Sequence, residues 1–170
     1  MAIPGSHRHN IEFAWRAHAA QENWTAKVDT KASIFFTVNG AGVAALVALR
    51  TQSGGVLEQL AGARQAVGDL GIVLCALAVV IAGAAIFPVL GRSKRHRVER
   101  DTIYFGHLRH RTPAEVAEQL RTLSDDEKLD QLAPQLVIKS RANWAKHRLL
   151  QLALAMALLG YVTVLIVVIG

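Results

Sequence analysis

The sequence is poor in the residues that hold small secreted domains and metal centres together. Its 170 residues include a single cysteine, Cys75. One cysteine cannot form a disulfide within the chain or build a cysteine-based zinc site, so a disulfide-stabilised fold is excluded. Cys75 lies inside a long hydrophobic segment, and we expect it to pack within a helix.

The chain also lacks the short motifs of common catalytic centres. It contains no G-x-S-x-G, no Walker loop and no H-E-x-x-H. The histidine pairs His7-x-His9 and His107-x-x-His110 have no third ligand nearby in the sequence, so we expect no metal site. The sequence therefore predicts a protein that is not an enzyme, with no catalytic residue, metal or cofactor of its own.

Three segments contain no charged residue. Residues 32–49 comprise 18 positions, which form a helix about 27 Å long at a rise of 1.5 Å per residue. Residues 70–91 and 149–170 comprise 22 positions each, enough to cross a bilayer with some tilt. Because so short a chain has too little polar sequence to cover three such segments, we predict an all-α integral membrane protein with three transmembrane helices.

Basic residues are unevenly divided among the remaining segments. Lys and Arg number four in residues 1–31, two in residues 50–69 and thirteen in residues 92–148. Cytoplasmic loops are enriched in Lys and Arg, so residues 1–31 and 92–148 are predicted to be cytoplasmic and residues 50–69 to form an external hairpin. We therefore expect a multi-pass protein of the cell inner membrane with its N-terminus in the cytoplasm.

The cytoplasmic part is expected to be small, helical and assembled from two segments. Residues 10–31 have a helical pattern, with Trp24, Val28 and Lys31 continuing one side of it. No Gly or Pro separates this helix from the first span. A kink is expected in the second span at Pro88.

Residues 92–148 contain two helix starts. Thr112-Pro113-Ala114-Glu115 has the pattern of a capping box with proline at the first helical position. Val116, Leu120 and Leu123 would give that helix an apolar face. Ser124-Asp125-Asp126-Glu127 repeats the capping pattern and begins a helix expected to break or kink near Pro134, beyond which the helical pattern continues into the third span.

One candidate binding group precedes the first span. Asp29 can accept a hydrogen bond from a ligand N–H, Lys31 can contact a phosphate, and Trp24 can offer a stacking face. Interfacial Trp and charged side chains that reach the lipid headgroups are the simpler explanation. Both interpretations stay open.

Two further groups lie in residues 92–148. Phe105 and His107 could equally belong to a small hydrophobic core closed by a glycine turn. Arg141, Trp144 and Lys146 precede the third span, where an aromatic and basic membrane belt is the alternative. Together the three groups offer cations for a phosphate, aromatic rings for a base and polar groups for a base edge, which is what a cyclic nucleotide requires.

A face of small residues runs along the first span. Gly40, Ala44 and Ala48 recur at a spacing of four, and such faces allow close helix packing within one chain or between copies. Packing within the chain is the simpler interpretation. The sharper hypothesis is that this face joins subunits of a homo-oligomer.

Several of these residues together resemble a known family. Trp24 and Asp29-x-Lys31-Ala32 before the first span, Tyr104-Phe105-Gly106-His107 after the second and Lys146 before the third resemble the transmembrane effectors of Pycsar, the pyrimidine cyclase system for antiphage resistance. The resemblance covers about residues 10–165, including the order of the spans and the helices between them.

The resemblance implies that a partner uridylate or cytidylate cyclase makes cyclic UMP or cyclic CMP on phage infection. It further implies that the effector binds this nucleotide and impairs the inner membrane, so that the infection aborts. The ligand contacts proposed above are inferred from residue chemistry and not carried over from the family. The net charge of +6 also suits a second hypothesis, a non-enzymatic membrane scaffold that binds anionic lipid or a partner protein; a nucleic-acid polymer is not expected.

Overall fold

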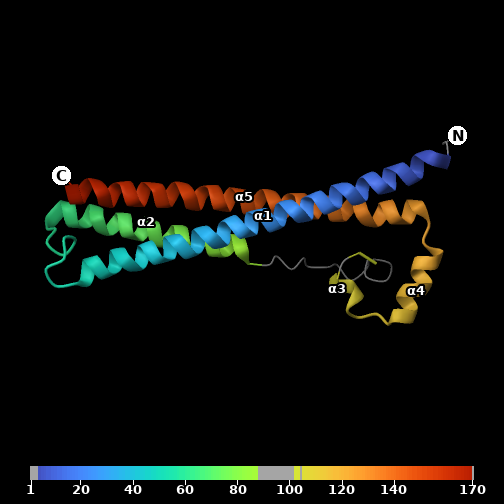
Figure 1. Cartoon of the computed structure of the whole chain (residues 1–170), viewed down its shortest axis with the longest axis horizontal. Coiled ribbons are helices and arrows are strands. Elements are labelled where there is room, and N and C mark those ends of the chain that lie inside the picture. Colours follow the sequence, from blue (N-terminus) through green and yellow to red (C-terminus); the bar gives the residue numbers. More distant parts are fainter. Residues whose placement is uncertain (1–3, 88–101, 104, 170) are drawn as a thin grey trace. The chain divides into compact units, whose positions relative to one another are not determined.

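The computed structural model describes residues 4–87, 102–103 and 105–169, with the backbone alone for residues 4–8 and 105. Within these ranges the chain forms five helices and no strand. They are α1 (Pro4–Thr51), α2 (Gly62–Ile86), α3 (Phe105–Leu108), α4 (Pro113–Thr122) and α5 (Asp125–Ile169), as Figure 1 shows. The prediction of an all-α chain is confirmed.

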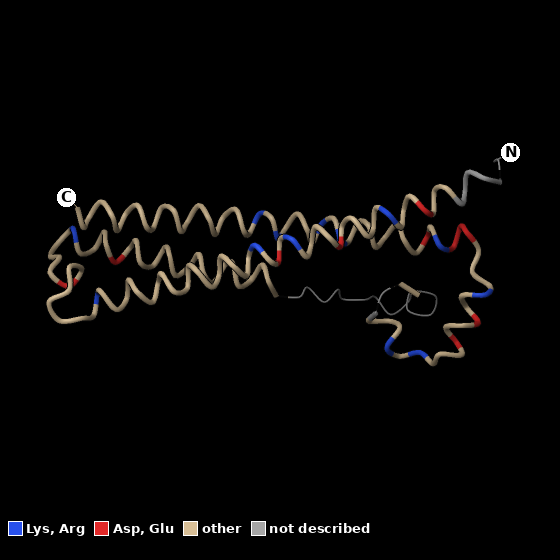
Figure 2. Tube along the Cα trace, viewed as in Figure 1, with Lys and Arg blue, Asp and Glu red and all other residues tan. Residues whose placement is uncertain are grey.

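Three helices of the described chain, α1, α2 and α5, are long and apolar enough to cross a membrane. Figure 2 shows extended stretches of all three without a charged residue. Each therefore presents apolar side chains that water would not solvate well, while its backbone groups are paired within the helix. The chain is a multi-pass membrane protein, as predicted.

The chain divides into two compact units. Unit 1 comprises Met1–Thr25 and Val89–Asn143, and unit 2 comprises Ala26–Pro88 and Trp144–Gly170. Both α1 and α5 contribute residues to each unit, because each is a single uninterrupted helix. The predicted continuity of the N-terminal helix with the first span is therefore confirmed.

Unit 2 is held together by small and apolar side chains from three helices. Val28 and Ala32 of α1, Ala85 of α2 and Leu150 of α5 form a buried cluster. These side chains fill the space between the helices without polar atoms that would need partners in a membrane.

Two glycines bring α2 and α5 close together further along unit 2. A Cβ added to Gly160 would lie 2.6 Å from the sulfur of Cys75 and 2.7 Å from the carbonyl oxygen of Gly71. Cys75 itself is fully buried, as the sequence predicted. Small residues of this kind let helix backbones approach closely, which is how helices commonly pack in membranes.

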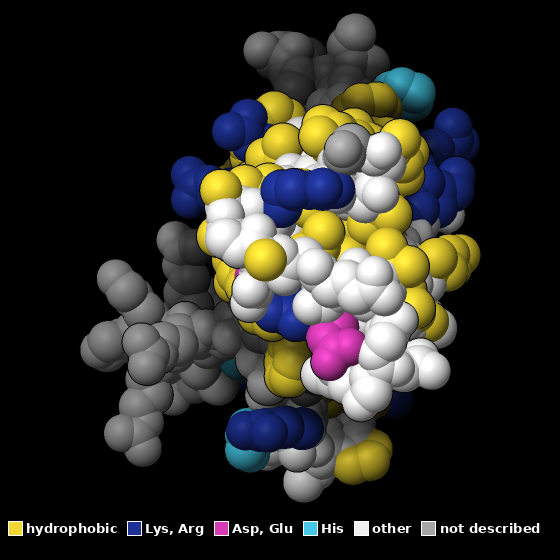
Figure 3. Space-filling view, turned by 90° about the vertical axis from the view of Figure 1, so that its left-hand side faces the viewer, with side chains coloured by type: hydrophobic (Ala, Val, Ile, Leu, Met, Phe, Trp, Pro, Cys, Tyr) yellow, Lys and Arg dark blue, Asp and Glu magenta, His cyan; other side chains and the backbone are white. Residues whose placement is uncertain are grey.

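The connection between α1 and α2 also belongs to unit 2. Arg50 Nε donates to Asp69 Oδ1 over 2.8 Å and so ties the end of α1 to α2. Arg64 Nη2 donates to the carbonyl of Val167 over 2.6 Å and ties α2 to α5. Gly54, with φ of 79°, occupies the left-handed region that glycine adopts without strain. Figure 3 views this end of the chain, where hydrophobic side chains lie beside basic, acidic and other polar ones.

Both predicted capping boxes of unit 1 are confirmed. Thr112 Oγ1 accepts from the Glu115 N–H over 3.3 Å, and the Thr112 N–H donates to Glu115 Oε2 over 2.8 Å. These hydrogen bonds to Thr112 lower the pKa of Glu115. Ser124 and Glu127 make the same reciprocal pair at the start of α5.

Other predictions for this region need correction. A break at Pro134 is wrong, because α5 continues through this residue; Leu132, fully buried nearby, anchors the helix despite the hydrogen bond that proline removes. The alternative of a kink there stays a prediction. Leu120 was expected on an apolar face but is exposed. Gly106, expected in a turn that closes the apolar residues before it, lies inside the single turn of α3. Pro88 lies outside the described residues.

Candidate ligand-response site

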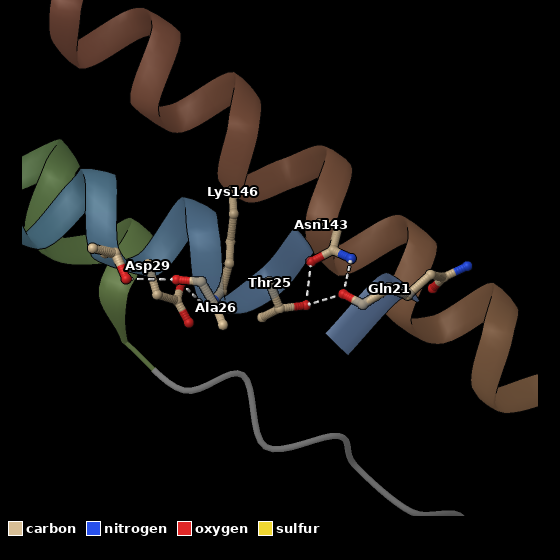
Figure 4. Close-up of polar contacts among 7 residues, drawn as sticks. Gln21, Thr25, Ala26, Asp29, Asn143 and Lys146 are labelled. Atoms are coloured by element: carbon tan, nitrogen blue, oxygen red, sulfur yellow. Dashed lines mark hydrogen bonds and ion pairs between the residues drawn. The ribbon is translucent and has the colours of Figure 1, made fainter. Parts of the chain in front are cut away.

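Polar side chains join α1 and α5 in unit 1. Thr25 Oγ1 donates to Asn143 Oδ1 over 2.5 Å, and Asn143 Nδ2 donates to the carbonyl of Gln21 over 3.1 Å. Figure 4 shows these three residues facing one another across the two helices. Asn143 is buried, so its amide depends on these partners and fixes the register of the contact.

An ion pair and a buried histidine extend the same contact. Lys139 Nζ of α5 lies 2.5 Å from Glu22 Oε1 of α1, and this hydrogen bond lowers the pKa of Glu22. His18 is buried, and its Nε2 has no hydrogen-bond partner among the residues that the structure describes. Burial, together with the charge of Lys139, lowers the pKa of His18 against the opposing effect of Glu22. His18 is therefore held in its neutral form near pH 7.

The first polar contact of α1 with α5 within unit 2 is an ion pair. Lys146 Nζ of α5 donates to Asp29 Oδ1 of α1 over 2.5 Å. Lys146 is only 8% exposed, whereas the Asp29 side chain is 35% exposed. A buried ammonium group needs an anionic partner. An anionic group from a ligand can replace a carboxylate in that role, and Asp29 is open enough to be displaced.

The structure brings only part of the predicted binding set together. Asp29 and Lys146 are joined directly, as Figure 4 shows. Trp24 and Arg141 lie in unit 1 and are exposed, and Lys31 and Trp144 lie in unit 2 and are exposed too.

The remaining two candidates belong to α3. His107 is buried, with 8% of its surface exposed. Phe105 begins the helix, but its side chain lies outside the described part of the chain. Within that part, no group of three or more His, Cys, Asp or Glu residues is arranged to hold a metal ion.

The polar contact of unit 1 was not among the candidates. The spacing gives only a partial signal for its residues, because Gln21 and Thr25 are four residues apart on α1, and Lys139 and Asn143 are four apart on α5, which puts each pair on one side of its helix but does not say what that side faces. The stripe predicted for α1 instead continued through Trp24 and Lys31. The structure turns both outward and buries Val28.

The helices and these contacts define a class: a multi-pass helical membrane protein in which polar side chains, including an ion pair, join its first and last spanning helices. A family model described as PycTM, Pycsar effector protein domain, matches residues 13–170. The chain therefore belongs to the Pycsar effector family and is an antiviral defence effector of the membrane. Comparison with curated proteins and with solved structures gave no match.

Proposed function

We propose that this effector binds cyclic UMP or cyclic CMP, made by a partner cyclase on phage infection, and then impairs the inner membrane so that the infection aborts. The observation that carries the proposal is the Asp29–Lys146 ion pair between α1 and α5. A cyclic nucleotide has one negative charge on its phosphate, the same charge as the carboxylate of Asp29. Nucleotide binding would thus exchange an intramolecular partner of Lys146 for a ligand.

The remaining candidates in unit 2 supply the other contacts that the ligand needs. Lys31 is an exposed cation on α1, and Trp144, 69% exposed, offers an aromatic face on α5 two residues before Lys146. In this proposal Lys146 binds the phosphate and the released Asp29 accepts from the base edge. Lys31 and Trp144 lie two positions along their helices from this pair and so on a different side; their long side chains reach round to the ligand, Lys31 to the phosphate and Trp144 to the base. Trp24, Phe105, His107 and Arg141, all in unit 1, stay predicted ligand-binding residues.

Loss of the Asp29–Lys146 pair would loosen α1 from α5 and alter the packing of the spans. A ligand changes such an equilibrium only through its different affinity for the two states, and moving it from 1:99 to 99:1 requires about 5.5 kcal/mol. Several nucleotides bound to one homo-oligomer supply this more easily than one. Ala44 and Ala48 are exposed within the single chain and so are available to such an assembly.

The decisive experiment measures nucleotide binding by the full chain in detergent. Cyclic UMP or cyclic CMP should raise the melting temperature, and cyclic AMP and cyclic GMP should not. Lys31→Ala should weaken binding about tenfold or more, because a charged hydrogen bond contributes about 1.5–3 kcal/mol. Trp144→Ala should also weaken binding, because it removes the stacking face. Lys27→Ala, which removes another exposed lysine of α1, is the matched control and should bind normally.

A second set of variants tests whether the nucleotide contacts unit 1 or unit 2. Trp24→Ala and Arg141→Ala alter exposed residues of unit 1. If only these two variants weaken binding, the nucleotide contacts unit 1. The proposal that its phosphate replaces Asp29 as the partner of Lys146 is then wrong. If no pyrimidine nucleotide binds the wild type but phosphatidylglycerol vesicles do, the protein is the membrane scaffold instead.

The membrane response needs its own readout. In liposomes, the binding nucleotide should dissipate an imposed membrane potential. Ala44→Leu should leave nucleotide affinity unchanged and suppress this depolarisation if the small-residue face joins subunits. Normal depolarisation in Ala44→Leu would remove that face from the mechanism.

A further inference from the structure

A buried amide lies among the spanning helices. Asn39 of α1 is 3% exposed, and its Nδ2 donates to the carbonyl of Cys75 on α2 over 3.1 Å. Its Oδ1 is buried as well and has no hydrogen-bond partner within the part of the chain that the structure describes. An acceptor left unpaired between transmembrane helices is costly, because no water compensates it, and such polar groups commonly serve a function.

A hydroxyl lies one helical turn away. Tyr161 of α5 directs its hydroxyl against Gly42 of α1, so closely that a Cβ at Gly42 would overlap the oxygen. No hydrogen bond of this hydroxyl occurs among the described residues. Gly42 follows Asn39 by three positions, so both lie on the same side of α1.

A third residue places the two groups at one level of the bundle. Cys75, whose carbonyl accepts from Asn39, also directs its sulfur towards the carbonyl of Ala157 over 3.8 Å. The same sulfur lies against Gly160, the residue next to Tyr161. Among the described residues, an amide oxygen and a hydroxyl that both lack a hydrogen bond thus lie about one helical turn apart, on two helices.

We propose that Asn39 and Tyr161 form a latch, a hydrogen bond from the Tyr161 hydroxyl to Asn39 Oδ1 that is open in this structure and closes in the membrane-impairing state. To form this hydrogen bond, the hydroxyl moves away from its contact with Gly42. A small shift or rotation of α5 against α1, of the kind seen at switching interfaces, is enough for this movement. Closing the latch gives the hydroxyl and the amide oxygen each a hydrogen-bond partner, and this stabilises the membrane-impairing state. The inference rests on the proposed function, from which it takes the nucleotide as the stimulus and impairment of the membrane as the response.

Tyr161→Phe removes the hydroxyl and little else. In this state the hydroxyl makes no hydrogen bond, so the melting temperature without nucleotide should stay unchanged or rise. Affinity for cyclic UMP or cyclic CMP should stay within twofold of the wild type. Nucleotide-triggered depolarisation of liposomes should slow at least tenfold, and Asn39→Ala should reproduce that loss. Thr163→Val is the matched control, because the Thr163 hydroxyl bonds only the carbonyl of Leu159 within α5.

Gly42→Ala tests the latch in the opposite direction and needs no nucleotide. The added methyl group displaces the Tyr161 hydroxyl from its seat, so liposomes should depolarise without ligand. The double variant Gly42→Ala/Tyr161→Phe should again cause no depolarisation without nucleotide. Ala155→Val, which enlarges an exposed residue of α5 outside this region, is the control.

The outcomes separate the two proposals. If the wild type responds to nucleotide and Tyr161→Phe responds equally, the latch is wrong and the proposed function stands. If no nucleotide acts on the wild type, the proposed function fails, and the latch is then decided by the glycine variants. A leak in Gly42→Ala that vanishes in the double variant supports the latch; no leak, or an unchanged leak in the double variant, overturns it.

Discussion

The same two helices meet in two different ways in this protein. In unit 1, α1 contacts α5 through amides, a hydroxyl and an ion pair, and the buried Nε2 of His18 has no hydrogen-bond partner among the described residues. In unit 2 the two helices pack through Val28, Ala32 and Leu150, beside the Asp29–Lys146 ion pair. Polar contacts can exchange with water or a ligand, whereas close-packed apolar contacts cannot. The comparison indicates that the contact of unit 1 is polar and exchangeable, whereas unit 2 combines an exchangeable ion pair with apolar packing that holds the helices together.

The largest expected effect comes from overfilling unit 2. Gly160→Leu would drive its side chain into Cys75 and the backbone of Gly71, at a cost of about 3 kcal/mol, the upper end for overpacking. The melting temperature in detergent measures this loss. Ala155→Leu places the same side chain at an exposed position of the same helix and should be close to neutral. Equal effects of the two variants would mean that unit 2 is not closely packed.

The next effect concerns the ion pair of unit 2. Asp29→Asn leaves the buried Lys146 without a countercharge and should cost about 1.5–3 kcal/mol. Lys146→Met should cost less, because the remaining carboxylate of Asp29 is 35% exposed and can be hydrated. Thermal unfolding of both variants provides the comparison. The reverse order would show that Asp29, not Lys146, is the more buried charge.

The polar contact of unit 1 should be weaker. Asn143→Ala removes the partner of Thr25 and Gln21 and should cost about 1 kcal/mol, a typical net value for a hydrogen bond. Asn23→Ala removes an exposed amide from α1 and should be neutral. Hydrogen exchange should also be faster at residues 18–25 in Asn143→Ala than in the wild type. A loss as large as that of Gly160→Leu would remove the distinction between the two units.

The smallest expected effect is a pH dependence of the melting temperature that arises from His18 in unit 1. The pKa of His18 is lowered from 6.5 mainly by burial. Neutral His18 therefore contributes stability that is present above pH 6.5 and is lost as the pH falls through its lowered value. The melting temperature of the wild type should fall between pH 7 and about pH 5, and His18→Gln should reduce that fall. Glu22 stays ionised in this window because its own pKa is lowered.

The elements of the fold followed from local sequence patterns. Uncharged segments predicted the spans, and Thr112 and Ser124 predicted two helix starts, because capping depends on residues three positions apart. The break predicted at Pro134 does not occur, since packing around Leu132 outweighs one missing hydrogen bond. Local patterns are thus most reliable where the interaction itself is local.

The contacts between helices were harder to predict. The sequence singled out Asp29 and Lys146 for their chemistry, but their pairing joins positions 117 residues apart. Trp24 was assigned to the same stripe as Val28, yet one is exposed and the other buried. Which side of α1 faces α5 depends on the register of the two helices, and the periodicity of a single helix does not contain that information.

The two arginine contacts beside the α1–α2 connection have a mechanical consequence. Arg50 and Arg64 fasten all three spanning helices to one another at that end, so the helices act as levers with a common fulcrum. At 1.5 Å per residue, Asp29 is about 31 Å along α1 from Arg50, and Gly42 is about 12 Å from it. A separation of about 4 Å at Asp29 then moves Gly42 by only about 1.5 Å. A separation of α1 from α5 at Asp29 would thus reach Gly42, among the spanning helices, as a much smaller displacement.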